Sequence, residues 1–211
     1  MTTATYRARR ATRRTQVRRR RLAWVVMLLG AGAVALGAAG IAGVGPLGDA
    51  VREITLPLRH EDIIRQQASD KEVDAALIAA VIYEESKFRD QTSHAGARGL
   101  MQITPGTADY IAAKSGGTEF EQGDLALPQI NIAYGAWYLD YLKDKYDGHE
   151  IAAVAAYNAG EGTVDGWVAT AGGLEVFGEG DIQFPETREY VDGVMDHRRA
   201  YRKHYDDELG Y

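Results

Sequence analysis

From about residue 60 to the C-terminus, apolar residues recur every three or four positions, which is the spacing of one face of an α-helix. No run shows convincingly the strict alternation of a half-buried β-strand. The pattern therefore predicts an all-α, mainly helical domain over residues 58–211, without an internal repeat. We expect its helices at residues 60–69, 74–87, 105–114, 128–146, 149–157, 161–170 and 186–205.

Residues at the expected helix ends fit this pattern. Asp74 is a typical N-cap residue, and Pro105 suits the first turn of a helix because its missing N–H would have no partner there. The longest irregular stretch is Ala171 to Phe184, which we interpret as a flap beside a functional site.

A different pattern occupies the N-terminal part of the chain, where Leu22 to Val44 contain no charged side chain. A helix of about 20 apolar residues crosses the hydrocarbon core of a bilayer. We predict one N-terminal transmembrane helix, a signal-anchor at residues 22–44, followed by a linker at residues 45–57. A cleaved signal peptide is the alternative, because Ala35 to Gly40 supply small residues for a cleavage site. The length of the run favours a retained anchor.

Charge is divided unevenly along the chain. Residues 1–21 contain many arginines and no acidic residue, whereas the whole chain has 24 Lys and Arg against 30 Asp and Glu. The positive-inside rule makes residues 1–21 a basic cytoplasmic tail and places the domain on the outer side of the membrane, in the periplasm or cell-wall space. Because the domain itself is acidic, we expect no nucleic acid among its partners.

Metal and thiol chemistry find little support in the sequence. The absence of cysteine excludes a disulfide framework and a thiolate zinc site. The histidines lack the HExxH spacing of a zinc enzyme, and we expect His197 and His204, amid arginines, to lie on a solvated face. The sequence therefore predicts no metal and no cofactor.

Two adjacent glutamates, Glu84 and Glu85, close one of the expected helices. Neighbouring helical positions point about 100° apart, so the two carboxyl groups face different surroundings. Glu85 continues the apolar stripe of Ile78, Val81 and Ile82, and burial raises the pKa of a carboxyl group, as a general acid requires. Glu84 lies off this stripe, and we expect it to be solvated and ionised. The alternative for Glu85 is a carboxylate that ends the apolar face and reaches solvent.

Four short motifs follow one another along the domain, and each has a local structural explanation when taken singly: ES at Glu85-Ser86, GLMQ at Gly99–Gln102, AYNAG at Ala156–Gly160 and ETREYV at Glu186–Val191. Together and in this order they resemble the lytic transglycosylases of the soluble type, over about residues 60–195. The resemblance implies a lysozyme-like fold and cleavage of peptidoglycan glycan strands between N-acetylmuramic acid and N-acetylglucosamine. It also implies a product with a 1,6-anhydromuramoyl end.

The same resemblance implies roles for particular residues. Glu85 matches the one catalytic acid, and Tyr190 matches a tyrosine close to its carboxyl group. One glutamate suffices because a 2-acetamido sugar carries its own nucleophile. The positions that match substrate-binding or groove-lining residues are Ser86, Gly99, Met101, Gln102, Tyr157 and Asn158.

Two other functions are compatible with these motifs. One is a lysozyme-like muramidase, in which a second carboxylate activates water for hydrolysis of the same bond. The candidates for that carboxylate are Asp109, Glu161 and Glu186. The other is a non-catalytic glycan-binding cell-wall protein, because resemblance in fold does not guarantee chemistry.

Overall fold

The computed structural model of the chain describes residues 45–116 and 119–211. The chain divides into two compact units between Thr55 and Leu56. In the first unit the described element is helix α2 (Gly45–Thr55). The linker predicted at residues 45–57 is therefore helical over most of its length, and its apolar residues Val51 and Ile54 follow a helical spacing.

The predicted transmembrane helix at residues 22–44 lies outside the described residues. Within residues 45–116 and 119–211, no helix is both long and apolar enough to cross a bilayer.

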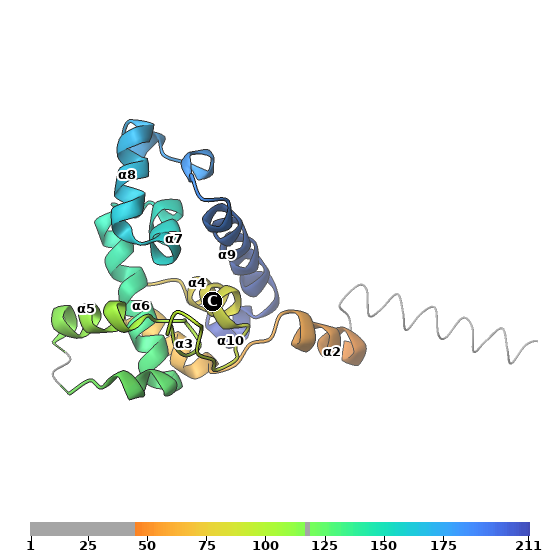
Figure 1. The fold of residues 1–211 in the computed structure, drawn as a ribbon. Coiled ribbons are helices and arrows are strands. Elements are labelled where there is room, and N and C mark those ends of the chain that lie inside the picture. Colours follow the sequence, from red (N-terminus) through yellow and green to blue (C-terminus); the bar gives the residue numbers. More distant parts are fainter. Residues whose placement is uncertain (1–44, 117–118) are drawn as a thin grey trace, which may run out of the picture. The chain divides into compact units, whose positions relative to one another are not determined.

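The second unit is mainly helical, as predicted, and each helix expected from the periodicity is present, with ends that differ from the predicted ones by at most two residues (Figure 1). The prediction did not include the last short helix or the 3₁₀ turns. The helices are α3 (Glu61–Asp70), α4 (Ala75–Ser86), α5 (Pro105–Ser115), α6 (Pro128–Lys145), α7 (Glu150–Ala159), α8 (Glu161–Ala171), α9 (Pro185–His204) and α10 (Asp206–Leu209). The 3₁₀ turns are η1 (Gln122–Ala126), η2 (Leu174–Val176) and η3 (Glu179–Asp181).

Polar side chains fix the starts of the helices that lead to the site. The Asp74 carboxylate accepts a hydrogen bond from the Ala76 N–H at 3.0 Å, so it caps α4 as predicted. Thr104 caps α5 by accepting from the Thr107 N–H at 3.2 Å, with Pro105 in the first turn.

Helix α4 forms the centre of the unit. Every residue from Ala75 to Ile82 is buried, and α9 packs along α4 while α7 contacts α6, α8 and α9 (Figure 1). The apolar stripe predicted through Ile78, Val81 and Ile82 is therefore not one face of an amphipathic helix, because α4 is buried on all sides over these turns. The surroundings of its two terminal glutamates depend on the neighbouring helices instead.

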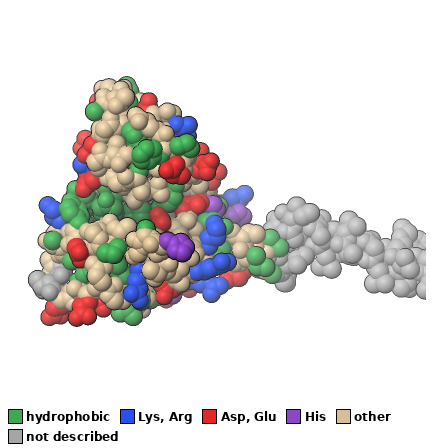
Figure 2. Space-filling view, viewed as in Figure 1, with side chains coloured by type: hydrophobic (Ala, Val, Ile, Leu, Met, Phe, Trp, Pro, Cys, Tyr) green, Lys and Arg blue, Asp and Glu red, His purple; other side chains and the backbone are tan. Residues whose placement is uncertain are grey.

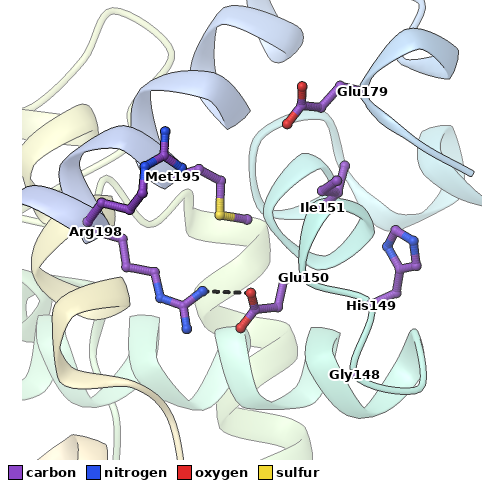
Figure 3. A pocket seen from close by; sticks show the side chains of 8 residues that line it. Gly148, His149, Glu150, Ile151, Glu179, Met195 and Arg198 are labelled. Atoms are coloured by element: carbon purple, nitrogen blue, oxygen red, sulfur yellow. Dashed lines mark hydrogen bonds and ion pairs between the residues drawn. The ribbon is translucent and has the colours of Figure 1, made fainter. Parts of the chain in front are cut away.

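An ion-pair network ties α4, α7 and α9 together at the end of α4 remote from the glutamates. Arg198 of α9 contacts the Asp74 carboxylate, and its Nη1 lies 2.6 Å from Glu150 Oε2 in the first turn of α7 (Figure 3). Burial by itself would raise the pKa of Asp74, but hydrogen bonds from Tyr211 and Arg198 hold it below its ordinary value. The network fixes the start of α4 relative to α9.

Candidate active site

Glu85 lies in the last turn of α4 and is half-buried. Burial raises the pKa of Glu85 to about 7, a hydrogen bond from Tyr190 opposes this rise, and the charge of Glu84 adds to it. A carboxyl group with this pKa holds its proton near neutral pH and can also release it. Both properties are needed in a group that acts first as an acid and then as a base.

Two tyrosines from different helices lie at this carboxyl group. The Tyr190 hydroxyl of α9 donates a hydrogen bond to Glu85 Oε1 at 2.8 Å. The Tyr157 hydroxyl of α7 donates to the Met101 carbonyl oxygen at 3.0 Å. Burial, followed by the nearby charge of Glu85, raises the pKa of both tyrosines well above the ordinary value. Both therefore stay protonated and act as hydrogen-bond donors.

The loop between α4 and α5 carries the GLMQ motif, and Ser86 fixes it to the end of α4. The Ser86 hydroxyl lies 2.7 Å from the Leu100 carbonyl oxygen and 3.1 Å from that of Ile82. Ser86 and Met101 are buried, so the structure changes the role expected for both: their side chains hold the loop in place rather than face solvent. The half-buried Gln102 donates from Nε2 to the Gly99 carbonyl oxygen at 2.7 Å.

Asn131 of α6 holds the same loop and is a residue that the sequence analysis missed. Its side chain is buried, accepts from the Met101 N–H at 2.8 Å and donates to the carbonyl oxygens of Arg98 at 2.9 Å and Leu125 at 3.0 Å. Gly99 packs directly against it with a φ of +80°, and a Cβ at Gly99 would lie 2.1 Å from Asn131 Nδ2. Position 99 therefore requires glycine for structural reasons. A lone asparagine between two isoleucines on a helix was the available signal.

The AYNAG and ETREYV motifs meet where α7 ends and α9 begins. The Thr187 hydroxyl donates to Asn158 Oδ1 at 2.8 Å. Thr187 is buried, whereas Asn158 is exposed. This bond ties the end of α7 to the helix that carries Tyr190.

A row of aromatic rings on α6 leads away from Tyr157. Tyr138 lies 5.6 Å from Tyr157 and 6.1 Å from Tyr141, centroid to centroid, and Trp137 stacks on Tyr141 at 5.6 Å. Trp137, Tyr141 and Tyr157 are half-buried. Figure 2 shows apolar side chains gathered in the hollow between the part formed by α7 and α8 and the part formed by α5.

The sequence predicts a solvated Glu84, but in the structure this side chain is largely buried. Its side chain is only 19% exposed, and its Oε1 lies 2.6 Å from His197 Nδ1 on α9. The expectation of a solvated face for His197 is wrong for the same reason, whereas His204 is exposed as predicted. A contact between residues so far apart in sequence depends on the packing of α4 against α9, which helical periodicity does not specify.

The candidate second carboxylates lie in other surroundings. Glu161 accepts from the Tyr141 hydroxyl at 3.0 Å and lies 3.3 Å from Lys145 Nζ. Asp109 is exposed and accepts from Gln122 Nε2 at 2.6 Å, and Glu186 is exposed in the first turn of α9. Among the carboxylates of the described residues, Glu84 is the one whose charge raises the pKa of Glu85.

The fold and the site together define a helical domain with a proton-holding carboxyl group that accepts a hydrogen bond from Tyr190, an arrangement suited to general acid catalysis. The family model described as "Transglycosylase SLT domain" matches residues 62–176, more than half of the chain. The chain belongs to this family. Helix α9 and Tyr190 lie beyond the matched residues.

Individual relatives are similar to this chain over part of their own length. The soluble lytic murein transglycosylase of Escherichia coli K12 is 35% identical over 163 residues, which cover 75% of this chain and 25% of that protein. Membrane-bound lytic murein transglycosylase C of Histophilus somni is 36% identical over 116 residues, 50% of this chain and 32% of that protein. The chain thus spans about a quarter to a third of the length of these relatives.

Solved structures show the same helical arrangement. The 70 kDa soluble lytic transglycosylase of Escherichia coli superposes with a TM-score of 0.68 at 33% identity, over 74% of this chain and 26% of that chain. An inactive glutamate-to-glutamine mutant of the lytic transglycosylase Slt from Pseudomonas aeruginosa gives a TM-score of 0.67 at 32% identity, over 74% and 26%. The expected lysozyme-like lytic transglycosylase fold of the domain is confirmed.

Proposed function

We propose that the domain is a peptidoglycan lytic transglycosylase that cleaves the β-1,4 bond between N-acetylmuramic acid and N-acetylglucosamine. The observation that carries this proposal is the single half-buried Glu85 carboxyl group, with a pKa raised to about 7 and a hydrogen bond from Tyr190. Membership in the transglycosylase SLT domain family and the names of the relatives support it. Ordinary glycosidases use a pair of carboxyl groups, and substrate-assisted enzymes are the exception.

In the proposed reaction, protonated Glu85 gives its proton to the glycosidic oxygen as the bond to C1 of the muramoyl residue breaks. The acetamido oxygen of that residue stabilises the positive charge that develops at C1. The Glu85 carboxylate then takes the proton of the muramoyl 6-hydroxyl, and this oxygen bonds to C1. Glu85 thus regains the proton that it gave to the glycosidic oxygen, and no water enters the product.

The other residues of the site bind or orient in this proposal. Tyr190 orients the Glu85 carboxyl group through its hydrogen bond. Gln102, Tyr157 and Asn158 hold the sugar, while Ser86, Gly99 and Met101 shape the loop that presents Gln102. The half-buried rings of Trp137 and Tyr141 offer apolar faces to a glycan strand.

We also infer that residues 22–44 anchor the protein in the membrane as a single span, with the N-terminus in the cytoplasm. The uncharged run and the preceding arginines support this inference. The acidic catalytic domain would then face peptidoglycan on the outer side. An anchored enzyme stays close to a polymeric substrate that cannot diffuse to it.

Product analysis and one substitution test the proposed function. Purified peptidoglycan digested by the protein should release fragments with anhydromuramoyl ends, about 18 Da lighter than the hydrolytic fragments of a muramidase. Glu85→Gln keeps the size of the side chain but has no proton to give, so it should abolish release while the far-UV circular dichroism spectrum is unchanged. Hydrolytic fragments would favour the muramidase, and no release by the wild-type protein would favour a glycan-binding protein.

A further inference from the structure

Glu84 and His197 form a close pair between α4 and α9. The Nδ1 of His197 lies 2.6 Å from Glu84 Oε1 and 2.8 Å from the Gly193 carbonyl oxygen. Both neighbours are hydrogen-bond acceptors, so Nδ1 carries the hydrogen, which it donates to the Gly193 carbonyl oxygen, while the Glu84 carboxylate lies in ion-pair contact with the imidazole. The Tyr83 ring packs on the imidazole with 4.1 Å between centroids, and the Glu84 side chain is only 19% exposed. These contacts fix the positions of the Glu84 and His197 side chains.

Gly193 provides the space for this pair. A Cβ at position 193 would lie 2.6 Å from Glu84 Oε1 and 2.9 Å from its Cδ. Gly193 stands inside the 20-residue helix α9, where glycine is unfavourable compared with alanine because it loses more backbone freedom on folding. The room that it leaves is occupied by the Glu84 carboxylate, which gives a physical reason for a glycine at a position where helix propensity disfavours one.

The same face of α9 contacts both glutamates of α4. Tyr190, Gly193 and His197 follow one another at spacings of three and four, which places them along one side of the helix. Tyr190 donates a hydrogen bond to Glu85, and His197 forms a close ion-pair contact with Glu84. The last turn of α4 is therefore fixed to α9 at two adjacent carboxyl groups.

On the basis of the proposed function, we propose that Glu84 is a positioning residue for Glu85: together with His197 and Gly193 it holds the end of α4 on α9 and keeps a negative charge next to the general acid. A negative charge close to a carboxyl group disfavours the ionisation of that group. Glu84 would thus keep Glu85 protonated over a wider pH range.

The groups that face Glu85 from its packing helices are Tyr190 of α9, Tyr157 of α7 and Glu84 of α4 itself. Burial makes the largest contribution to the raised pKa of Glu85, Tyr190 lowers this pKa by its hydrogen bond, and Glu84 raises it further. Around the pair itself, the Lys87 ammonium group lies 4.3 Å from the centre of the Tyr83 ring. Tyr190 and Glu84 thus shift the pKa of Glu85 in opposite directions.

Replacement of Glu84 by glutamine removes the charge and keeps the size of the side chain. In the full-length chain, titration of the Glu85 side-chain carboxyl carbon by NMR reports its pKa without any need for turnover. We expect Glu84→Gln to lower this pKa by about half a unit to one unit, which is the effect of one like charge at short range. The descending limb of kcat/KM against pH, measured on purified peptidoglycan, should move to lower pH by the same amount.

A second variant, Gly193→Ala, keeps the negative charge of Glu84. The atoms that its Cβ would meet belong to the far end of the flexible Glu84 side chain, so we expect the carboxylate to move out toward solvent while α9 gains a better helix former. The pKa of Glu85 should fall, as in Glu84→Gln, and the double variant should show no further fall. Glu189→Gln is the matched control, because Glu189 is exposed beside Tyr190 and its loss should leave the pKa of Glu85 unchanged.

An unchanged Glu85 pKa in folded Glu84→Gln, or a shift no larger than in the Glu189→Gln control, would overturn this proposal. If Glu84→Gln does not fold, an unchanged pKa in Gly193→Ala would overturn it equally. Hydrolytic products from the wild-type protein would instead overturn the proposed function, and the NMR shift would still decide the role of Glu84.

Discussion

The raised pKa of Glu85 predicts that this residue destabilises the folded protein at neutral and alkaline pH. The folded state holds the proton up to about pH 7, whereas an unfolded chain releases it near the ordinary value of 4.5. The folded state thus binds more protons between these two values, so its stability falls as the pH rises through this window. Below pH 4.5 the carboxyl group is protonated in both states and the penalty disappears.

The size of the effect follows from the same two values. A rise from 4.5 to about 7, at about 1.4 kcal/mol for each pH unit, corresponds to about 3 kcal/mol. Glu85→Gln replaces the carboxyl group by a neutral group of the same size that can still accept the hydrogen bond from Tyr190. We expect the variant to match the wild-type protein in stability at pH 4 and to exceed it by about 3 kcal/mol at pH 8.

Urea unfolding of both proteins at a series of pH values between 4 and 8 measures this difference. Glu189→Gln, an exposed glutamate on α9, serves as the control for loss of a surface charge and should show no comparable trend. A difference between Glu85→Gln and wild type that stays constant with pH would refute the inference that Glu85 holds its proton in the folded state.

Three further predictions concern the site and its loop. Tyr190→Phe removes the hydrogen bond that lowers the pKa of Glu85, so this pKa should rise by about one to two units in an NMR titration; a fall would contradict the geometry. Gly99→Ala should cost about 3 kcal/mol in urea unfolding because its Cβ meets buried atoms, whereas Gly96→Ala, at a similar φ but with no atom closer than 3.9 Å, should cost about 1 kcal/mol; equal losses would disprove the close approach. Glu161→Gln should still cleave peptidoglycan, since Tyr141 and Lys145 already engage its carboxylate; an inactive, folded variant would support the muramidase.

The order and the ends of the helices could be predicted because they depend on local signals. Periodicity placed each predicted helix of the domain within two residues of its observed ends, and the Asp74 cap and Pro105 marked two starts. These features are encoded within a few neighbouring residues, so one sequence suffices to find them.

The contacts that shape the site depend on tertiary packing and could not be predicted in this way. Glu84 contacts His197, and the Met101 N–H donates a hydrogen bond to the Asn131 side chain. The partners in both contacts are far apart in the sequence. An amphipathic helix would expose Glu84 to solvent, whereas α4 is buried on all sides up to Ile82. Periodicity within one helix does not show which neighbouring helix covers a residue at its end.

The proposed reaction is tested most directly by digestion of purified peptidoglycan in water labelled with heavy oxygen. Because the muramoyl 6-hydroxyl, and not water, closes on C1, we predict that the released fragments have the same mass as those formed in ordinary water. Fragments heavier by about 2 Da would carry an oxygen atom from water at the cleaved bond. That result would contradict the single-carboxyl mechanism and identify the domain as a hydrolase.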